Sequence, residues 1–272
     1  SKFVANKVNE IGVSNLSLSN GSSLEVKNNT YMSTANLEAY DSSFSIDKAW
    51  FEGYESNINN STLKATNKAD VAFDILTATD STLIVDKKAT ISSNDLTIND
   101  GDIIVETNSR LGALNKENIM IDEGYIFGYS LDEYFETPKS DINISNATIT
   151  LNGTASLQNA ISLTKITESG PDEIIGILDK KTFENPDLLI DKYIKQARKS
   201  GDFDYISERE YRETVRNLIQ SQDLVKGNIS LTNATIQMNG TSSIINSLFN
   251  EEDDSGYITF IGGLAIVILG IQ

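Results

Sequence analysis

A pair of closely similar segments restricts the fold of this chain more than any other sequence feature. Residues 141–154 read DINISNATITLNGT, and residues 228–241 read NISLTNATIQMNGT. At an offset of 87 residues their apolar positions coincide, and both segments end in Asn-Gly-Thr. A unit repeated in this way predicts a stack of like units, each of which buries its apolar side against its neighbours.

Looser copies of the same unit occur upstream, at residues 15–26 and 95–105. One apolar series recurs at steps of 19 to 23 residues, at Leu24, Phe44, Leu63, Leu83, Ile103, Ile126 and Ile149. A companion series of similar spacing contains Leu16, Leu37, Ile58, Leu76, Leu96, Ile119 and Ile142. We therefore expect each period to contain at least two short strands.

Within these strands apolar and polar residues alternate, as in residues 16–18 (LSL) and 149–151 (ITL). The Asn-Gly and Asn-Asn pairs between strands tolerate positive φ angles and turn the chain sharply. Strands and corners that return at this spacing predict a mainly β fold, a parallel β-helix or β-solenoid. The alternative is an antiparallel β-sandwich of short strands, although a sandwich does not require a fixed period.

The repeat is interrupted between residues 171 and 227, where helical signals replace the alternation. Pro186 before Asp187 is typical of a helix start, and Ser207 with Glu210 forms a capping box. We predict β-solenoid coils at 1–170, a small α-helical insertion at 171–227, a resumed solenoid at 228–256 and an apolar segment at 257–272. The insertion holds 10 basic and 12 acidic residues, a net charge of −2, which leaves 12 basic and 27 acidic residues elsewhere, a net charge of −15.

Composition excludes several classes of site. The chain has no histidine and no cysteine. Ser-His-Asp and Cys-His nucleophilic sites, disulfides and most zinc sites are thereby removed. The net charge of −17 opposes binding to the phosphates of nucleic acids, so we expect no nucleic-acid partner.

The carboxylates show no catalytic pattern. Acidic residues such as Asp70, Asp74, Asp80 and Asp86 are spread along the coils, and no compact acid-base cluster can be identified, although stacking could assemble one from different coils. The acidic run at 251–254 lacks the alternating ligands and the turn glycine of a calcium loop, and we interpret it as a solvated loop. The sequence thus predicts no catalytic residue, no cofactor and no metal ligand.

The helical insertion is the most distinctive candidate for a binding surface, because excursions from a regular scaffold commonly carry specificity. Lys192, Lys195, Arg198 and Lys199 would line one helix and form a candidate contact surface. A solvated charged face without a partner is an equally good interpretation of the same pattern.

Triplets of the form Asn-x-Ser/Thr recur along the coils. Among them, Asn146, Asn152, Asn233 and Asn239 are candidate glycosylation sites. In a repeat rich in asparagine, serine and threonine, many such triplets arise from turn chemistry alone.

The C-terminal residues 257–272 carry no charge. A helix of this length would reach only about 25 Å, the lower limit for spanning a bilayer. As strands, the segment would form a last coil or a contact between subunits, and its β-branched residues favour strands. Last coil, subunit contact and membrane anchor all remain open.

Coils of the type NISNATITLNGT (residues 143–154) resemble the passenger regions of bacterial autotransporter adhesins and, more broadly, extracellular pectate-lyase-like β-helix proteins. The resemblance covers most of residues 15–161 and 228–245. It implies secretion, a β-helical stalk, and adhesion or self-association at the cell surface, on the outer membrane or cell envelope.

These observations together predict a non-catalytic, surface-displayed adhesin or envelope scaffold. Its expected partners are a glycan or protein on a host or neighbouring cell, or further copies of the chain within a homo-oligomer or a larger polypeptide. One alternative is a subunit of a surface filament or surface layer, anchored or polymerised through residues 257–272. Another is a β-helix lyase or hydrolase that acts on polysaccharides.

Overall fold

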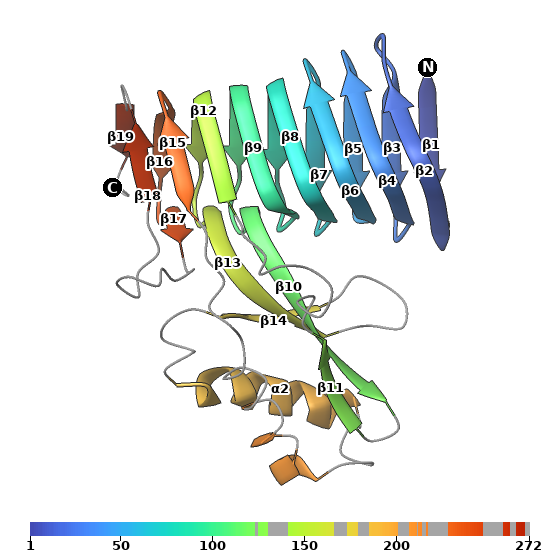
Figure 1. The fold of residues 1–272 in the computed structure, drawn as a ribbon, viewed down its shortest axis with the longest axis vertical. Coiled ribbons are helices and arrows are strands. Elements are labelled where there is room, and N and C mark those ends of the chain that lie inside the picture. Colours follow the sequence, from blue (N-terminus) through green and yellow to red (C-terminus); the bar gives the residue numbers. More distant parts are fainter. Residues whose placement is uncertain are drawn as a thin grey trace.

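The computed structural model describes residues 1–122, 125–129, 141–165, 173–178, 185–200, 207–210, 212–213, 216, 228–246, 258–261 and 265–269. In these residues the protein is mainly β, and successive coils of short strands lie side by side along one axis (Figure 1). Strands of neighbouring coils pair in parallel throughout the stack. The predicted parallel β-solenoid is confirmed.

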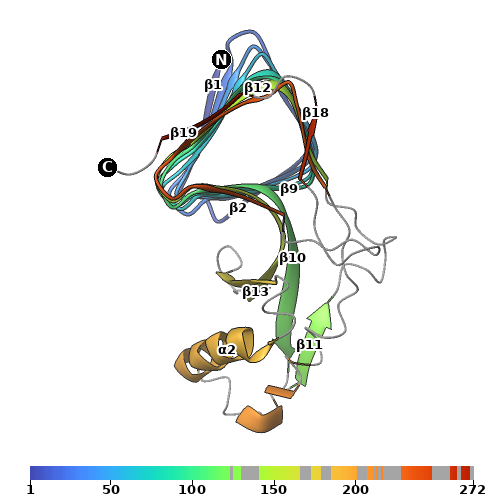
Figure 2. The ribbon, with the colours of Figure 1, turned by 90° about the vertical axis from the view of Figure 1, so that its left-hand side faces the viewer.

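Viewed along its axis, the stack has a triangular cross-section with three faces (Figure 2). Face A consists of β1 (Lys2–Asn6), β3 (Ser23–Lys27), β5 (Ser43–Asp47), β7 (Thr62–Thr66), the last parts of β8 (Asp70–Val85), β9 (Thr90–Val105) and β12 (Asp141–Leu151), β16 (Thr235–Asn239) and β19 (Ala265–Leu269). Each of these strands therefore has a parallel neighbour in at least one adjacent coil.

Face B consists of the first parts of β2 (Glu10–Leu18), β4 (Tyr31–Tyr40), β6 (Trp50–Asn59), β8, β9, β10 (Arg110–Asp122) and β13 (Ser156–Lys165), followed by β17 (Ser243–Asn246). Face C consists of the second parts of β2, β4 and β6, the middle of β8 and β9, the first part of β12, then β15 (Ile229–Thr232) and β18 (Ile258–Ile261).

The two similar segments that dominate the sequence are neighbouring coils. Ile142 lies opposite Ile229, and Ile149 lies opposite Ile236. In the other direction Ile149 lies opposite Ile103. The offsets of 87 and 46 residues thus separate strands that are in direct contact, because the intervening chain leaves the stack and returns.

Two members of the predicted apolar series do not belong to the stack. Ile119 lies in the outer part of β10, and Ile126 lies in β11 (Tyr125–Tyr129), which pairs antiparallel with β10. Their spacing along the sequence matches the period by coincidence. Both residues lie in a part of the chain that leaves the stack, so they do not pair with the other members of the series. The ladder passes directly from Ile103 to Ile149.

The register of face C also differs from the prediction at one coil. Ser56, not Ile58, pairs with Leu37 and Leu76, whereas Ile58 continues the row of Ala39. Both side chains are buried. Ser56 and Ile58 both point inward from the same strand, and the spacing of the series does not distinguish between them. The prediction took Ile58 because it is the more apolar of the two.

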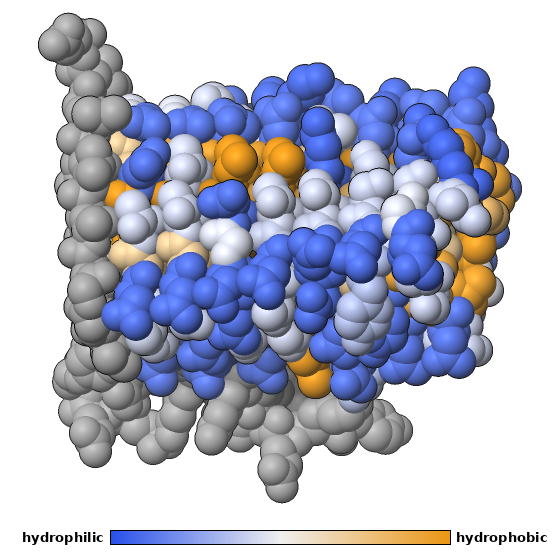
Figure 3. Space-filling model, turned by 90° about the horizontal axis from the view of Figure 1, so that it is seen from above, coloured by the Kyte–Doolittle hydropathy of each residue, from blue (hydrophilic) through white to orange (hydrophobic). Residues whose placement is uncertain are grey.

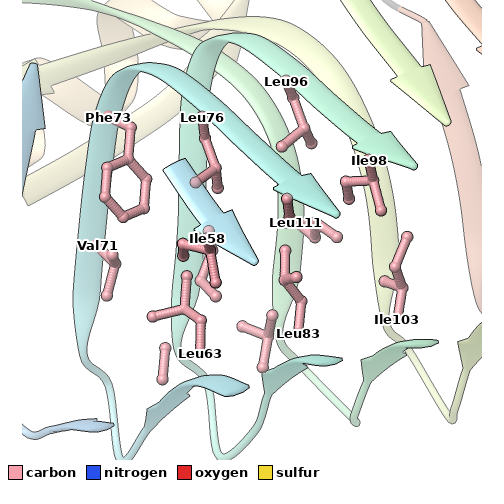
Figure 4. Packing of buried hydrophobic residues seen from close by; sticks show 14 of the residues in the cluster. Ile58, Leu63, Val71, Phe73, Leu76, Leu83, Leu96, Ile98, Ile103 and Leu111 are labelled. Atoms are coloured by element: carbon pink, nitrogen blue, oxygen red, sulfur yellow. The ribbon is translucent and has the colours of Figure 1, made fainter. Parts of the chain in front are cut away.

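Inward side chains of successive coils form one continuous core (Figure 4). Three aromatic rings contribute to it, with centroids 4.6 Å apart for Phe44 and Phe51 and 5.8 Å apart for Phe51 and Phe73. Gly53 pairs with Phe73 in the ladder, and a Cβ atom at Gly53 would meet both the Phe73 ring and the Ser56 hydroxyl. The small residues 53 and 56 therefore make room for the Phe73 ring.

The corner between faces C and A is built from polar residues. Asn20, Asp41, Asn60 and Asp80 occupy it in successive coils, all with positive φ angles, which asparagine and aspartate adopt more readily than most residues. Beneath them, buried hydroxyls connect the coils: the Ser42 amide donates to Ser61 Oγ at 2.9 Å, and the Ser61 amide donates to Ser81 Oγ at 3.2 Å. The corner is thus turned without leaving these buried amides unpaired.

A second structural part, which we call the arm, leaves face B (Figures 1 and 2). The outer parts of β10 and β13 run together, β11 pairs antiparallel with β10, and β14 (Glu173–Leu178) pairs antiparallel with β13. Helix α2 (Asp187–Ser200) lies against β14. Residues 113–122 and 125–129, which the sequence had assigned to the coils, thus join part of the predicted insertion 171–227.

The predicted helix signals are confirmed. Helix α2 begins at Asp187, directly after Pro186. In the capping box the Ser207 amide donates to Glu210 Oε2 at 3.1 Å, and the Glu210 amide donates to Ser207 Oγ at 3.3 Å. Leu189, Ile190 and Ile194 of α2 are buried, whereas Leu188 is 40% exposed.

The apolar C-terminal segment contains two strands. β18 pairs in parallel with β15, and β19 pairs in parallel with β16. Of the three interpretations of residues 257–272, this pairing favours the last coil. Among the described residues, no helix has the length and apolar composition that crossing a lipid bilayer requires.

The stack predicts a sharp contrast between adjacent side chains of β12. Ile149 is fully buried between coils, whereas Thr150 is on the outward side of the same strand. We expect Ile149→Ala to lower the free energy of unfolding by about 2 to 5 kcal/mol, because it leaves a cavity in the core. Thr150→Ala should change it by no more than about 0.5 kcal/mol. Urea unfolding followed by circular dichroism measures both, and equal effects would contradict the assigned register.

Candidate functional site

The structure contains a shallow groove of about 350 Å³ at the corner between faces B and C. We call it the corner groove. Its lining comes from neighbouring coils and includes Ser33, Glu52, Tyr54, Phe73, Asp74 and Asn94. Three of these residues, Tyr54, Asp74 and Asn94, follow one another at steps of 20 residues and lie where the parallel pairing of β6, β8 and β9 is interrupted.

Two aromatic residues contribute to the lining of the corner groove. Phe73 belongs to the core and is only 5% exposed, whereas Tyr54 is 55% exposed. Gly53 adds no side chain between them. A phenol ring held open to solvent beside a buried ring gives the groove an apolar surface that a ligand can contact.

Two carboxylates supply the polar part of the groove, and each is held by one neighbour. The Tyr31 hydroxyl donates to Glu52 Oε2 at 2.7 Å, and Asn94 Nδ2 donates to Asp74 Oδ1 at 2.6 Å. Among the described residues, the second oxygen of each carboxylate has no hydrogen-bond partner. The lining residues include no lysine or arginine.

The negative charge at this corner affects two neighbouring groups. Partial burial, together with the hydrogen bond to Glu52 and the repulsion of its charge, raises the pKa of Tyr31 to about 12. Desolvation by packed neighbours, and repulsion by Asp141 and Asp74, raise the pKa of Asp95. Both shifts favour the uncharged form of a group near the groove.

The acidic residues singled out in the sequence are not brought together. Asp70 begins β8 on face B, Asp74 lies in the corner groove, Asp80 occupies the corner between faces C and A, and Asp86 follows face A. In the described part of the chain, no group of three or more acidic residues is placed to hold a metal ion. The acidic run 251–254 lies outside the described residues.

The candidate contact surface on α2 is only partly available. Lys192 and Lys195 are exposed, whereas Arg198 Nη2 forms an ion pair with Glu208 Oε2 at 2.6 Å. Lys199 lies in α2, but its side chain is outside the described residues. Further ion pairs, Arg212 with Asp191 and Arg216 with Asp187, join α2 to the segment that follows it.

The four candidate glycosylation sites form two short ladders across neighbouring coils. Asn233 Nδ2 donates to Asn146 Oδ1 at 3.4 Å, and Asn239 Nδ2 donates to Asn152 Oδ1 at 2.6 Å. Asn146 and Asn233 both have positive φ angles at the corner between faces C and A. Their position supports the turn-chemistry interpretation of these triplets, while their glycosylation stays a prediction.

The sequence did not identify the corner groove, because its residues are distant along the chain and only one of them, Asp74, had been noted. The sequence did contain one indication of the groove. Tyr54, Asp74 and Asn94 occupy equivalent positions in successive repeats, 20 residues apart. Superimposing the repeats by register would have placed the three side chains together.

Comparison with known proteins gave no assignment: no protein-family model matches the chain, and neither the curated proteins nor the solved structures include a significant match. Of the resemblance to autotransporter passengers, the β-solenoid is confirmed. Its implications for secretion and adhesion remain predictions.

The contact between Tyr31 and Glu52 predicts a dependence of stability on pH. Because the pKa of Tyr31 is raised to about 12, its contribution is complete below the ordinary tyrosine pKa of 10.0 and is lost as the pH rises through 12. Tyr31→Phe should cost about 1 kcal/mol at neutral pH by removing a partly exposed hydrogen bond. The difference between wild type and variant in urea unfolding should shrink from pH 10 upward, and a constant difference would contradict the assignment.

Proposed function

We propose that this chain is a non-catalytic structural or adhesive element displayed at the cell surface, an adhesin or envelope scaffold. The observation that carries the proposal is the arm, a separate set of strands with a helix that projects from an otherwise regular rod (Figure 1). A stiff scaffold that holds one irregular part away from itself is suited to presenting that part to a partner.

Charge distinguishes the segment 171–227, which contains helix α2, from the rest of the chain. Residues 171–227 carry a net charge of −2, and the rest of the chain carries −15. On the outer surface of α2, Lys192 and Lys195 are exposed. Repulsion between acidic rods keeps like molecules apart laterally, while the segment 171–227, with a net charge of only −2, can approach a glycan or protein on a neighbouring cell.

Surface display is tested directly on the cells that produce the protein. A membrane-impermeant, amine-reactive biotin reagent should label Lys192 and Lys195 to the same extent in intact and in lysed cells, because both amines are exposed. Peptide mapping by mass spectrometry gives the extent at each lysine, with a cytosolic protein as the unlabelled control. Labelling that requires lysis would overturn the proposal.

A second candidate, a subunit of a surface filament, is favoured by the first coil. Among the described strands, β1 pairs only with β3 and β2 only with β4, so the outer edge of each has no partner strand within these 272 residues. Phe3, Val4 and Val8 are 52%, 46% and 37% exposed there, and apolar residues gather at this end of the rod (Figure 3). Open strand edges with apolar side chains are prone to pair with another chain.

A second copy of the chain fits this edge by its strand order. The opposite end of the stack presents β19 on face A, β17 on face B and β18 on face C. The first coil presents β1 on face A and the two parts of β2 on faces B and C. Head-to-tail stacking would therefore continue all three faces and generate an open filament.

Replacing one apolar side chain tests this candidate. Phe3→Glu should abolish concentration-dependent association of the 272-residue chain in sedimentation velocity experiments, because it places a charge at the contact. Tyr40→Glu, a matched change at a 47% exposed aromatic on the side of the rod, should leave association intact. A wild-type chain that stays monomeric at every concentration would exclude the filament.

A further inference from the structure

We infer that the corner groove binds an alkylammonium group, with the Tyr54 ring against its methylene groups and Glu52 and Asp74 as acceptors for its N–H donors. The ligand class is a primary amine on a flexible alkyl chain, either a free polyamine or the side chain of a lysine residue. This inference is independent of where the protein is displayed, because it depends only on the groove itself.

The charge of the groove selects a cation. Glu52 and Asp74 both line it, each retains one oxygen without a protein partner among the described residues, and no basic residue lies in the lining. A cleft with one sign of charge concentrates the field and attracts ions of the opposite sign. Acidic glycans and phosphate groups are accordingly excluded from this site.

The carboxylates are already oriented before a ligand arrives. Tyr31 fixes one oxygen of Glu52, and Asn94 fixes one oxygen of Asp74. Both partners are neutral, so they position the carboxylates without neutralising them. An ammonium group would thus meet preformed acceptors and form charge-assisted hydrogen bonds with the remaining oxygens.

The aromatic residues select an organic cation over a metal ion. Tyr54 lines the groove and is 55% exposed, and the buried Phe73 also contributes to the lining. An ammonium group near a phenol ring gains cation–π attraction, and its alkyl chain covers the apolar surface. A hydrated metal ion uses neither of these features, and the described carboxylates are too few to replace its water.

The volume also fits this ligand. A groove of about 350 Å³ lies at the lower end of the usual range for small-molecule sites. It therefore accommodates an extended diamine or a lysine side chain with part of its backbone. Its open form allows the rest of a longer ligand to continue across the corner.

The experiment titrates the whole chain with putrescine and, separately, with a short peptide that contains one lysine, using isothermal calorimetry at low ionic strength. Tyr54→Ala and the double variant Glu52→Gln/Asp74→Asn should each weaken amine binding about tenfold or more, because the first removes the aromatic ring and the second removes both charged acceptors. Asp102→Asn is the matched control, since Asp102 is an exposed acid on face A, outside the groove. The neutral analogue butanediol should not bind.

Binding of putrescine alone supports the inference with a free polyamine as the source, and equal binding of the peptide supports it with a protein lysine as the source. Two results would overturn it. One is amine binding that is identical in wild type, both groove variants and Asp102→Asn, which would reflect only the charge of −17. The other is binding of a neutral methyl glycoside with no binding of either amine. Unchanged circular dichroism and melting temperature verify that each variant folds.

Discussion

The parallel backbone pairing between coils is the constraint on which the rest of the structure depends. Each strand must lie opposite its counterpart one coil away, as Leu63 lies opposite Leu83 and Leu83 opposite Ile103. This requirement fixes which residues point inward and where the chain turns. The asparagines and aspartates with positive φ angles and the buried serines fix the corner between faces C and A at one position in each coil. A corner displaced by one residue would reverse which side chains of the next strand point into the core.

The fold was predictable from the sequence because each coil of a solenoid repeats the same pattern of alternating apolar and polar residues followed by corner residues. Alternation and corner residues identified the strands, and the offset between residues 142 and 229 identified two copies of one unit, which the structure places in neighbouring coils. Spacing could not predict that residues 113–122 and 125–129 leave the stack, since Ile119 and Ile126 continue the apolar period. A sequence period reports only how far apart residues are along the chain, whereas strand pairing requires that they are close in space.

The site was less predictable than the fold for a related reason. Tyr54, Asp74 and Asn94 become neighbours only when β6, β8 and β9 are in register, and none of them belongs to a motif on its own. The lysines of α2 were found because helical spacing places them together locally, yet Arg198 proved to be paired with Glu208. Helical contacts are local in sequence, whereas a groove on a solenoid is assembled across coils.

Both excursions of the arm leave the stack from face B, after Gly112 and after Asn159, and the ladder closes behind them. Closing 87 residues instead of 20 adds only about 1 kcal/mol of loop entropy, so the finished rod is hardly weakened. The order of folding is affected more. Coils before Arg110 join strands about 20 residues apart, while β12 and β15 must wait for longer closures. The N-terminal half thus serves as a template that the later coils extend, and the arm can vary in length or be exchanged over evolution without disturbing that template.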